Sequence, residues 1–268
     1  MEAKPTHVGI DGDILLYQAA FAPEVRGYIC YDETFTPLAF FKYKKDTTDY
    51  PIVQPYNCVE IEDIPFACGV FTSKINMILR ATGAKTYTLY LTGKNNFRTE
   101  IYPLYKSSRG AKPLLYNEVR AHALRDKFTV VVDGQEADDA LSIAQYKNPK
   151  GHIIASIDKD LLMVPGHHYN FNKDVTSFTT EEEGLRTFYK QILTGDATDD
   201  IPGIKGIGPK KAEKILEECE TAEQMWYTAL DKWAQVGVDE ATVIKYGQLL
   251  WMREYDGEYW EPPREIRQ

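Results

Sequence analysis

The first two thirds of the chain alternate short apolar runs with segments of helical periodicity. Four apolar runs predict strands, at His7–Ile10, Thr86–Leu91, Phe128–Val132 and His152–Ile157. Apolar residues at helical spacing predict helices at Gly12–Phe21, Pro65–Ala81 and Glu136–Tyr146. This alternation favours an α/β fold, with a mostly parallel central sheet flanked by helices.

Two other stretches have a different pattern. Residues 24–65 are aromatic and proline-punctuated without a sustained helical period, and they indicate an inserted β-ribbon or loop. From about residue 181 the pattern is almost wholly helical. It predicts helices at Glu181–Leu193, Pro209–Glu218, Ala222–Ala234 and Asp239–Met252. The sequence therefore predicts an α/β core over residues 1–180 and a helical region over residues 181–268.

Length and composition narrow the class of protein. The chain has 268 residues, enough for one large domain or a core with a smaller appendage. Its apolar runs stay well below the roughly 18 residues of a membrane span, and its first residues do not resemble a signal peptide. The cysteines follow no CxxC or zinc-binding spacing, so we expect free thiols. We expect a cytoplasmic, monomeric protein with no membrane partner.

Acidic residues follow the predicted strands. Asp11 comes at the end of the first strand, Glu136 shortly after the third, and Asp158 directly after the fourth. Because sites in open parallel sheets form beyond the carboxyl ends of the strands, these side chains should converge at one edge. Each acidic motif alone is more often a turn, a helix cap or a solvated helix start. Their combination and order favour a common site.

Carboxylates without clustered His or Cys indicate a hard divalent cation. The candidate ligands are Asp11, Glu136, Asp138, Asp139, Asp158, Asp160, Asp196 and Asp199. Their oxygen atoms suit Mg²⁺ or Mn²⁺ rather than zinc. They are more numerous than one ion needs, which suggests two ions that act together in phosphodiester hydrolysis.

The stretch Thr194–Ala212 joins the last of these acids to a glycine-punctuated turn and a run of lysines. Glycines let the backbone turn tightly and approach a ligand, and the helix predicted after Pro209 would offer unpaired amides to a phosphate. The residues concerned are Gly203, Gly206, Gly208, Lys210 and Lys211. The net charge of −9 is compatible with nucleic-acid binding, because residues 94–112 are locally basic.

Taken together, these blocks resemble the 5′ nuclease superfamily of flap endonucleases and 5′→3′ exonucleases. The matching blocks, in chain order, are IDGDILLY, FRTEIYPLYKSSR, GQEADD, SIDKDL and TGDATDDIPGIKGIGPKKA. The resemblance runs through nearly the whole chain and is closest to the exonucleases of tailed phages. It implies a PIN-like α/β core, a gateway over about residues 93–125, and a helix–hairpin–helix element after residue 181.

The resemblance also implies roles for single residues. The eight acids match the metal ligands of the family, while Lys106, Arg109 and Arg98 match residues that contact the scissile phosphate or a phosphate nearby. Tyr17 matches an aromatic residue that stacks on a base, and the glycine turn with Lys210 and Lys211 matches the duplex-binding hairpin. In that hairpin the backbone carbonyls of Ile204 and Ile207 would hold a potassium ion.

One position departs from the family pattern. An Asp is common just after the second strand, where this chain has Thr92 or Gly93. The remaining acids could still hold two ions, with water or Asp13 supplying the missing ligand. Asp200 takes the place of a usual Asn and is expected to have a supporting role.

The resemblance implies a metal-dependent 5′→3′ exonuclease or flap endonuclease that acts on duplex ends, flaps or nicks and leaves 5′-phosphate products. It further implies a place in phage DNA replication or recombination, inside the infected bacterial cell. RNA–DNA hybrids are a second possible substrate. Two rivals stay open. One is an aspartyl-phosphate phosphohydrolase with Asp11 as nucleophile, and the other is a catalytically weak protein that binds DNA junctions.

Overall fold

The computed structural model describes residues 5–60 and 63–263, and these form two compact units. The first, here the sheet unit, comprises residues 5–13, 77–110 and 128–263. The second, here the ribbon unit, comprises residues 14–60, 63–76 and 111–127. This division differs from the predicted boundary at residue 180, because the helices after that residue belong to the sheet unit. Residues 61–62 and 264–268 of the predicted segments lie outside the described part.

A six-stranded sheet organises the sheet unit, with strand order β6-β5-β1-β7-β8-β9. The strands are β1 (His7–Asp11), β5 (Thr86–Asn96), β6 (Thr129–Gly134), β7 (His152–Ala155), β8 (Gly166–Asn170) and β9 (Val175–Thr179). All neighbours pair in parallel except β8 and β9, which are antiparallel. The prediction of a mostly parallel sheet is confirmed. The carboxyl ends of β1, β5, β6 and β7 therefore share one edge, as a site at that edge requires.

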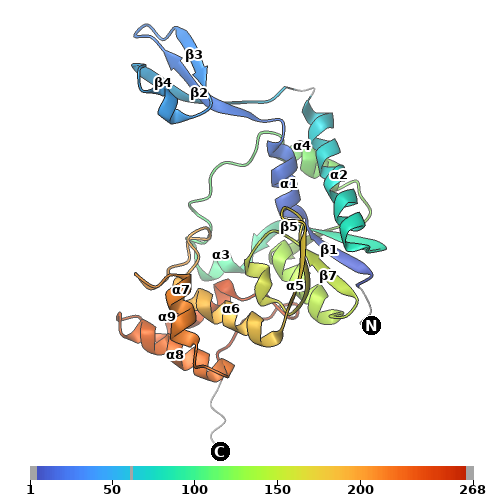
Figure 1. The fold of residues 1–268 in the computed structure, drawn as a ribbon, viewed down its shortest axis with the longest axis vertical. Helices are drawn as coiled ribbons and strands as arrows, with labels where there is room; N and C mark the ends of the chain where they lie inside the picture. Colours follow the sequence, from blue (N-terminus) through green and yellow to red (C-terminus); the bar gives the residue numbers. More distant parts are fainter. Residues whose placement is uncertain (1–4, 61–62, 264–268) are drawn as a thin grey trace, which may run out of the picture. The chain divides into compact units, whose positions relative to one another are not determined.

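Helices cover this sheet and extend the sheet unit (Figure 1). Helix α5 packs against β1, β5 and β7, and helix α6 packs against α7, α8 and α9. Their bounds are α3 (Phe97–Ile101), α5 (Ala137–Lys147), α6 (Glu181–Thr194), α7 (Pro209–Leu216), α8 (Ala222–Ala234) and α9 (Glu240–Leu250), with a 3₁₀ helix η2 (Asp160–Met163). All four helices predicted after residue 181 are present. The ring of Phe188 in α6 meets Trp251 and Trp260 edge-on at 4.8 and 5.1 Å, so these aromatic contacts hold the segment after α9 against this helix.

The ribbon unit contains the predicted insertion, which forms an antiparallel sheet of order β3-β2-β4. Its strands are β2 (Val25–Tyr31), β3 (Pro37–Phe41) and β4 (Ile52–Cys58), with a 3₁₀ helix η1 (Lys44–Thr47). The unit also holds most of α1 (Gly12–Phe21), the first part of α2 (Asp63–Thr82) and α4 (Tyr116–Ala123). Tyr17 of α1 meets Tyr116 of α4 edge-on at 5.4 Å. The prediction of a ribbon is confirmed, whereas α4 was not predicted.

Two expectations from composition concern the whole chain. All the cysteines have free thiols, as predicted. Within the described ranges, we find no helix that combines the length and the apolar character needed to cross a membrane.

Two histidines, the half-buried His7 and the buried His152, lie on neighbouring strands near the amino ends of those strands. His7 of β1 pairs in register with His152 of β7, and their rings stack at 5.5 Å. The Nδ1 atom of His152 lies 2.6 Å from Gln145 Oε1. Burial, with the nearby His7 and His168, lowers the pKa of His152 to about 3. His152 therefore stays neutral in the folded protein over a pH range in which an exposed histidine is charged.

This difference predicts a loss of stability in acid. The unfolded chain binds a proton at His152 below a pH of about 6.5, whereas the folded chain resists this until the pH nears 3. The free energy of unfolding should therefore fall by about 1.4 kcal/mol per pH unit from this residue alone across that window. Urea denaturation at several pH values checks this, with His152→Gln expected to flatten the slope. Parallel curves for the two proteins would contradict the prediction.

Candidate active site

The end of β1 and the segment after β7 bring two of the predicted acids to one hydroxyl group. Asp11 is almost fully buried, and its Oδ2 accepts a hydrogen bond from Ser156 Oγ at 2.6 Å. The same hydroxyl accepts from the backbone N–H of Asp158 at 3.0 Å. Ser156 thus orients both acids. Our sequence analysis did not single it out, although it is the first residue of the block SIDKDL.

Helix α5 adds two acids from its first turn. Glu136 is the N-cap residue of the helix, and Asp138 follows it within that turn. Burial raises the pKa of Asp138 well above its ordinary value, and the negative charges of Asp11, Asp158 and Glu136 raise it further. These carboxylates are therefore close enough to repel one another. The structure brings together Asp11, Glu136, Asp138 and Asp158, as the strand-end argument predicts.

A tyrosine and a lysine connect Glu136 to the loop after α6. The hydroxyl of Tyr105 donates to Glu136 Oε2 at 2.8 Å and lies 3.0 Å from Asp199 Oδ2. Lys106 Nζ donates to Glu136 Oε1 and lies 3.5 Å from Asp199 Oδ2. Burial alone would raise the pKa of Glu136, but the charges of Lys106 and Arg98 hold it below its ordinary value. Glu136 is thus an anion, and the side chains of Tyr105 and Lys106 hold its carboxylate in place.

The segment around Lys106 is fixed to the loop by its backbone as well. Lys106 has a left-handed backbone conformation, with φ of 57°, and its N–H donates to the carbonyl of Asp199 at 3.0 Å. Asp200 Oδ2 accepts from the N–H of Ser108 at 2.8 Å. Arg109, half-exposed, pairs with Asp199 Oδ1 at 2.7 Å. Asp200 therefore supports the site by holding the segment that carries Lys106 and Arg109, in keeping with the supporting role expected for it.

Asp160 and Asp196 form a second acidic group beside the first. Lys159 Nζ lies 2.8 Å from Asp160 Oδ1 and 3.4 Å from Asp196 Oδ2, and Gln191 also donates to Asp160. Burial and the charge of Asp158 raise the pKa of Asp160 to about 7. Burial opposes ionisation of Asp196, yet hydrogen bonds with Asp160 and Thr198 keep its pKa low. Asp160 therefore binds a proton more readily than Asp196 does.

The acids converge without forming a ready-made ligand cluster. Over residues 5–60 and 63–263, no group of three or more His, Cys, Asp or Glu side chains is arranged to hold a metal ion as it stands. The reason is visible in the ion pairs, because Lys106 and Arg109 are drawn to Glu136 and Asp199. Basic side chains here compensate the charge that a divalent cation would otherwise neutralise.

Two predicted roles are corrected by a buried ion pair. Arg98 is 1% exposed, and it holds both oxygens of Asp139 at 2.6 and 2.8 Å. Its guanidinium also donates to the carbonyls of Leu249 and Trp251, each at 2.8 Å. The prediction that Arg98 binds phosphate is therefore wrong, because its guanidinium faces the protein interior. Asp139, fully buried, is its counter-ion rather than an acid that faces the site.

Thr92 and Gly93, which stand where the 5′ nuclease pattern has an additional Asp, lie in the long strand β5. A Cβ at Gly93 would lie 2.2 Å from Asp133 Oδ1 and 2.7 Å from the carbonyl oxygen of Val132, so any side chain there would displace the neighbouring strand. Thr92 receives a hydrogen bond from Ala137 N–H at 2.9 Å, and its own N–H donates to Asp13 Oδ2 at 3.1 Å. Asp13 thus supports the backbone at the position where the acid is absent.

The glycine-rich stretch forms a tight connection between α6 and α7. A Cβ at Gly203 would lie 1.9 Å from the carbonyl oxygen of Thr194, and Gly206 has φ of 82°, so both positions favour glycine. Lys210 and Lys211 are exposed in the first turn of α7, whose N-cap is Gly208. The carbonyl of Ile204 accepts from Ile207 N–H at 3.0 Å. Binding of duplex DNA or potassium by these residues stays a prediction.

Tyr17 belongs to the ribbon unit, so its predicted role is considered within that unit. Its half-buried ring packs against Tyr116 and lies 6.0 Å from the ring of Phe21. Base stacking by Tyr17 also stays a prediction.

Comparison with known proteins finds partial sequence similarity to a flap endonuclease and to DNA polymerases. No family model matches the chain. A flap endonuclease Xni of Pseudoalteromonas translucida is 28% identical over 176 residues, which cover 59% of this chain and 68% of that protein. A DNA polymerase I of Borreliella burgdorferi is 30% identical over 149 residues, which cover 48% of this chain and 16% of the polymerase. The chain thus corresponds to a small part of that polymerase.

A solved structure shows the same fold. The T5 D15 protein, co-crystallized with metal ions, has a TM-score of 0.54 and 16% sequence identity, with 91% of this chain and 97% of that chain covered. This likeness confirms the predicted α/β fold. Together with the sequence relatives, it confirms the resemblance to the 5′ nuclease superfamily.

The buried ion pair of Arg98 and Asp139 predicts that Arg98 stabilises the fold and does not bind phosphate. Arg98→Met leaves Asp139 buried without its partner, so the free energy of unfolding should fall by about 3–5 kcal/mol. Arg109→Met is the matched control and should cost less than about 1 kcal/mol, because Arg109 is half-exposed. Chemical denaturation of both variants provides the measurement. Unchanged stability of Arg98→Met would contradict the structural role.

Proposed function

Taking this relationship to the 5′ nucleases as the premise, we propose that the chain is a metal-dependent 5′→3′ exonuclease or flap endonuclease that hydrolyses DNA phosphodiester bonds. The observation that carries the proposal is the contact of Lys106 and Arg109 with Glu136 and Asp199. These contacts place a basic pair directly beside an acid at the start of α5 and an acid in the loop after α6. A phosphodiester would find cations for its oxygens next to ligands for a metal.

The donor set fits Mg²⁺ or Mn²⁺. Every candidate ligand is a carboxylate, and hard oxygen donors are the ligands that these ions prefer. Burial, and then the neighbouring negative charges, raise the pKa values of Asp138 and Asp160, and a bound divalent cation would offset both effects. The residues that would hold two ions are Asp11, Glu136, Asp138, Asp158, Asp160, Asp196 and Asp199. When bound, the ions would supply an activated water and stabilise the leaving oxygen, giving a 5′-phosphate product.

The basic side chains bind and orient the substrate in this proposal. Lys106 is held by its backbone against the loop of Asp199, so its ammonium is kept at the acids. An incoming phosphate competes with Glu136 for that ammonium and thereby frees the carboxylate. Positive charge placed in advance at the reacting phosphate stabilises the transition state more than the ground state. Arg109, half-exposed, is suited to receive the phosphate from solvent.

Other residues would hold the rest of the DNA. The amides of Gly206 and Gly208 and the exposed Lys210 and Lys211 suit a phosphate backbone, which is gripped without regard to sequence. A potassium ion on the carbonyls of Ile204 and Ile207, and stacking by Tyr17, complete this picture. We further propose that the protein is a monomer acting in phage DNA replication or recombination, and that RNA–DNA hybrids are alternative substrates.

The two rivals make different demands on the same residues. An aspartyl-phosphate phosphohydrolase needs Asp11 as an accessible nucleophile, but Asp11 is 2% exposed and bound by Ser156. A junction-binding protein needs the basic surfaces but not the acids. In a junction-binding protein no metal ion would offset the repulsion between Asp138 and the neighbouring carboxylates, and this repulsion would only destabilise the fold. The acids therefore favour the nuclease.

The proposal predicts cleavage that depends on Asp138. With 5′-labelled duplex and flap DNA in Mg²⁺, we expect mononucleotides from an exonuclease or released flaps from an endonuclease. Asp138→Asn should lower the rate at least a hundredfold, by removing a ligand of the metal site. Asp133→Asn is the control, since Asp133 is an exposed acid on β6 that binds the N–H of Lys94. DNA binding without cleavage in either Mg²⁺ or Mn²⁺ would contradict the proposal.

A second prediction concerns the lysine. Lys106→Ala should lower single-turnover cleavage at least tenfold, because its ammonium offsets charge at the reacting phosphate. Binding of the same DNA, measured by anisotropy in Ca²⁺, should stay near normal. Lys147→Ala, at the exposed end of α5, should leave both quantities unchanged. A cleavage rate near that of the wild type for Lys106→Ala would refute the assigned role.

A further inference from the structure

The sheet of the ribbon unit has two unlike faces. One face carries the fully buried Cys30 and is covered by η1, whose Thr47 is buried. The opposite face is open and apolar, with Val25, Leu38 and Phe40 each about half-exposed, at 50%, 56% and 48%. A sheet this small gains little from burying one face alone, so an open apolar face of this kind indicates a binding surface.

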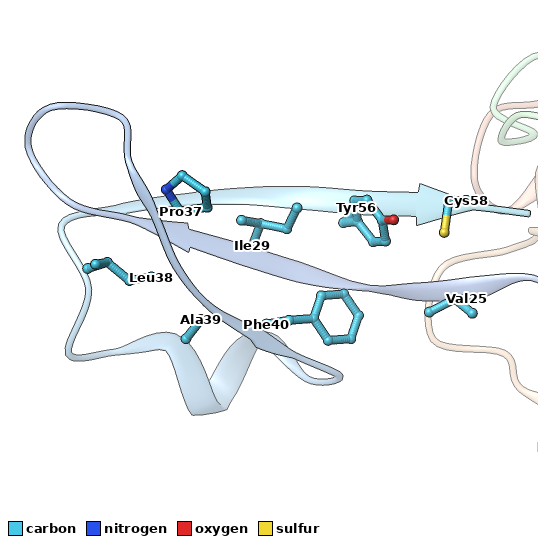
Figure 2. Close-up of a pocket in the computed structure, with 8 residues that line it drawn as sticks. All are labelled: Val25, Ile29, Pro37, Leu38, Ala39, Phe40, Tyr56 and Cys58. Carbon is cyan, nitrogen blue, oxygen red and sulfur yellow. The ribbon is translucent and has the colours of Figure 1, made fainter.

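This open face contains a shallow hollow of about 530 Å³, lined in part by Ile29, Phe40 and Tyr56 (Figure 2). Gly27 lies in the central strand, where a Cβ would come within 2.5 Å of the ring of Phe40. Glycine in a central strand weakens the strand, and here it makes room for an aromatic ring to lie on the sheet. The rings of Phe40 and Tyr56 meet edge-on at 5.5 Å. The face thus presents aromatic rings on a rigid support.

Positive charge gathers at the end of β3. Lys42, Lys44 and Lys45 follow Phe40 closely, and no acid intervenes before Asp46. Tyr43, 54% exposed, has the ammonium groups of Lys42 and Lys45 each 5.6 Å from its ring centre. In a chain whose net charge is −9, this local excess of lysine is complementary to a polyanion. Aromatic rings beside lysines are the chemistry that binds single-stranded nucleic acid.

The base of the ribbon is firmly attached within its unit. The carboxylate of Glu24 is buried and accepts from Arg26 at 2.7 Å, from Asn57 at 2.9 Å and from the N–H of Leu114 at 3.1 Å. These contacts join the beginning of β2, the end of β4 and the segment 111–127, which follows Arg109 in the chain. The open face is therefore held by several hydrogen bonds and not by a single linker.

We propose that the open face of β2, β3 and β4 binds the unpaired 5′ strand of a DNA flap. Bases would stack on Phe40 and Tyr56, and Lys42, which follows β3 directly and lies beside the exposed ring of Tyr43, would pair with a phosphate. Only an unpaired strand offers its bases in this way, since the bases of a duplex stack on one another. The inference rests on the proposed function for its substrate class, and it makes flapped DNA a better substrate than a nicked duplex without a flap.

The test compares binding and cleavage for one double variant. Phe40→Ser with Tyr56→Ser should weaken binding of a fluorescein-labelled oligothymidylate of about 15 nucleotides at least tenfold, by anisotropy in EDTA. Cleavage of flap DNA at subsaturating enzyme should fall similarly, while cleavage of the nicked duplex should not change. Phe178→Ser is the matched control, because Phe178, on β9 of the sheet unit, is exposed to a similar degree, at 58% against 48% for Phe40. Phe40→Tyr should retain binding.

Other results would overturn either the inference or the proposed function, and the two can be told apart. Cys30 is buried under the covered face, so its resistance to thiol labelling shows that the variant sheet remains folded. With the sheet folded, unchanged oligonucleotide affinity would refute the binding site even if the wild type cleaves DNA. Self-association of the wild type that the double variant abolishes, without an effect on DNA, would assign the face to a protein partner instead. Failure of the wild type to cleave any DNA would count against the proposed function, whereas the anisotropy result would still decide this inference.

Discussion

Repulsion among carboxylates at one edge of the sheet is the constraint on which the arrangement of the sheet unit depends. Acids from β1, from the segment after β7, from α5 and from the loop after α6 meet there, and burial raises the cost of each negative charge. Three sets of cations offset that cost. Arg98 neutralises Asp139, Lys106 and Arg109 neutralise Glu136 and Asp199, and Lys159 lies between Asp160 and Asp196. The positions of these basic residues follow from the positions of the acids.

Much of the fold could be predicted because it follows local periodicity. The helices at Gly12–Phe21 and Ala222–Ala234 have the predicted bounds. The strands β8 and β9 could not be predicted in this way, since GHHYN and VTSFT are short, with polar residues among the apolar ones. Their pairing depends on an available edge beside β7, which is a property of the folded sheet. The pairing of β4, the third strand of the ribbon, likewise depends on an available edge, here beside β2.

The candidate site likewise contains residues that could be predicted from the sequence and a residue that could not. The rule that sites lie at the carboxyl ends of parallel strands was enough to group Asp11, Glu136 and Asp158. It could not separate the two basic residues Arg98 and Lys106, which lie eight positions apart in one locally basic stretch. Their roles differ because Arg98 donates to the carbonyls of Leu249 and Trp251, which lie 151 and 153 residues further along the chain. No local signal encodes that contact, so the sequence assigned to Arg98 the solvent-facing role that fits Lys106 and Arg109.

Glu136 links the structural and the chemical parts of this arrangement. Its Oε2 lies 3.8 Å from the buried Arg98, and its Oε1 accepts from Lys106. Its backbone N–H donates to Asp139 at 3.0 Å, so the start of α5 is fixed by the same ion pair that fills the interior. Burial raises the pKa of Glu136, and the charges of Lys106 and Arg98 together lower it below its ordinary value. The buried guanidinium therefore contributes, with Lys106, to keeping Glu136 an anion at this edge of the sheet.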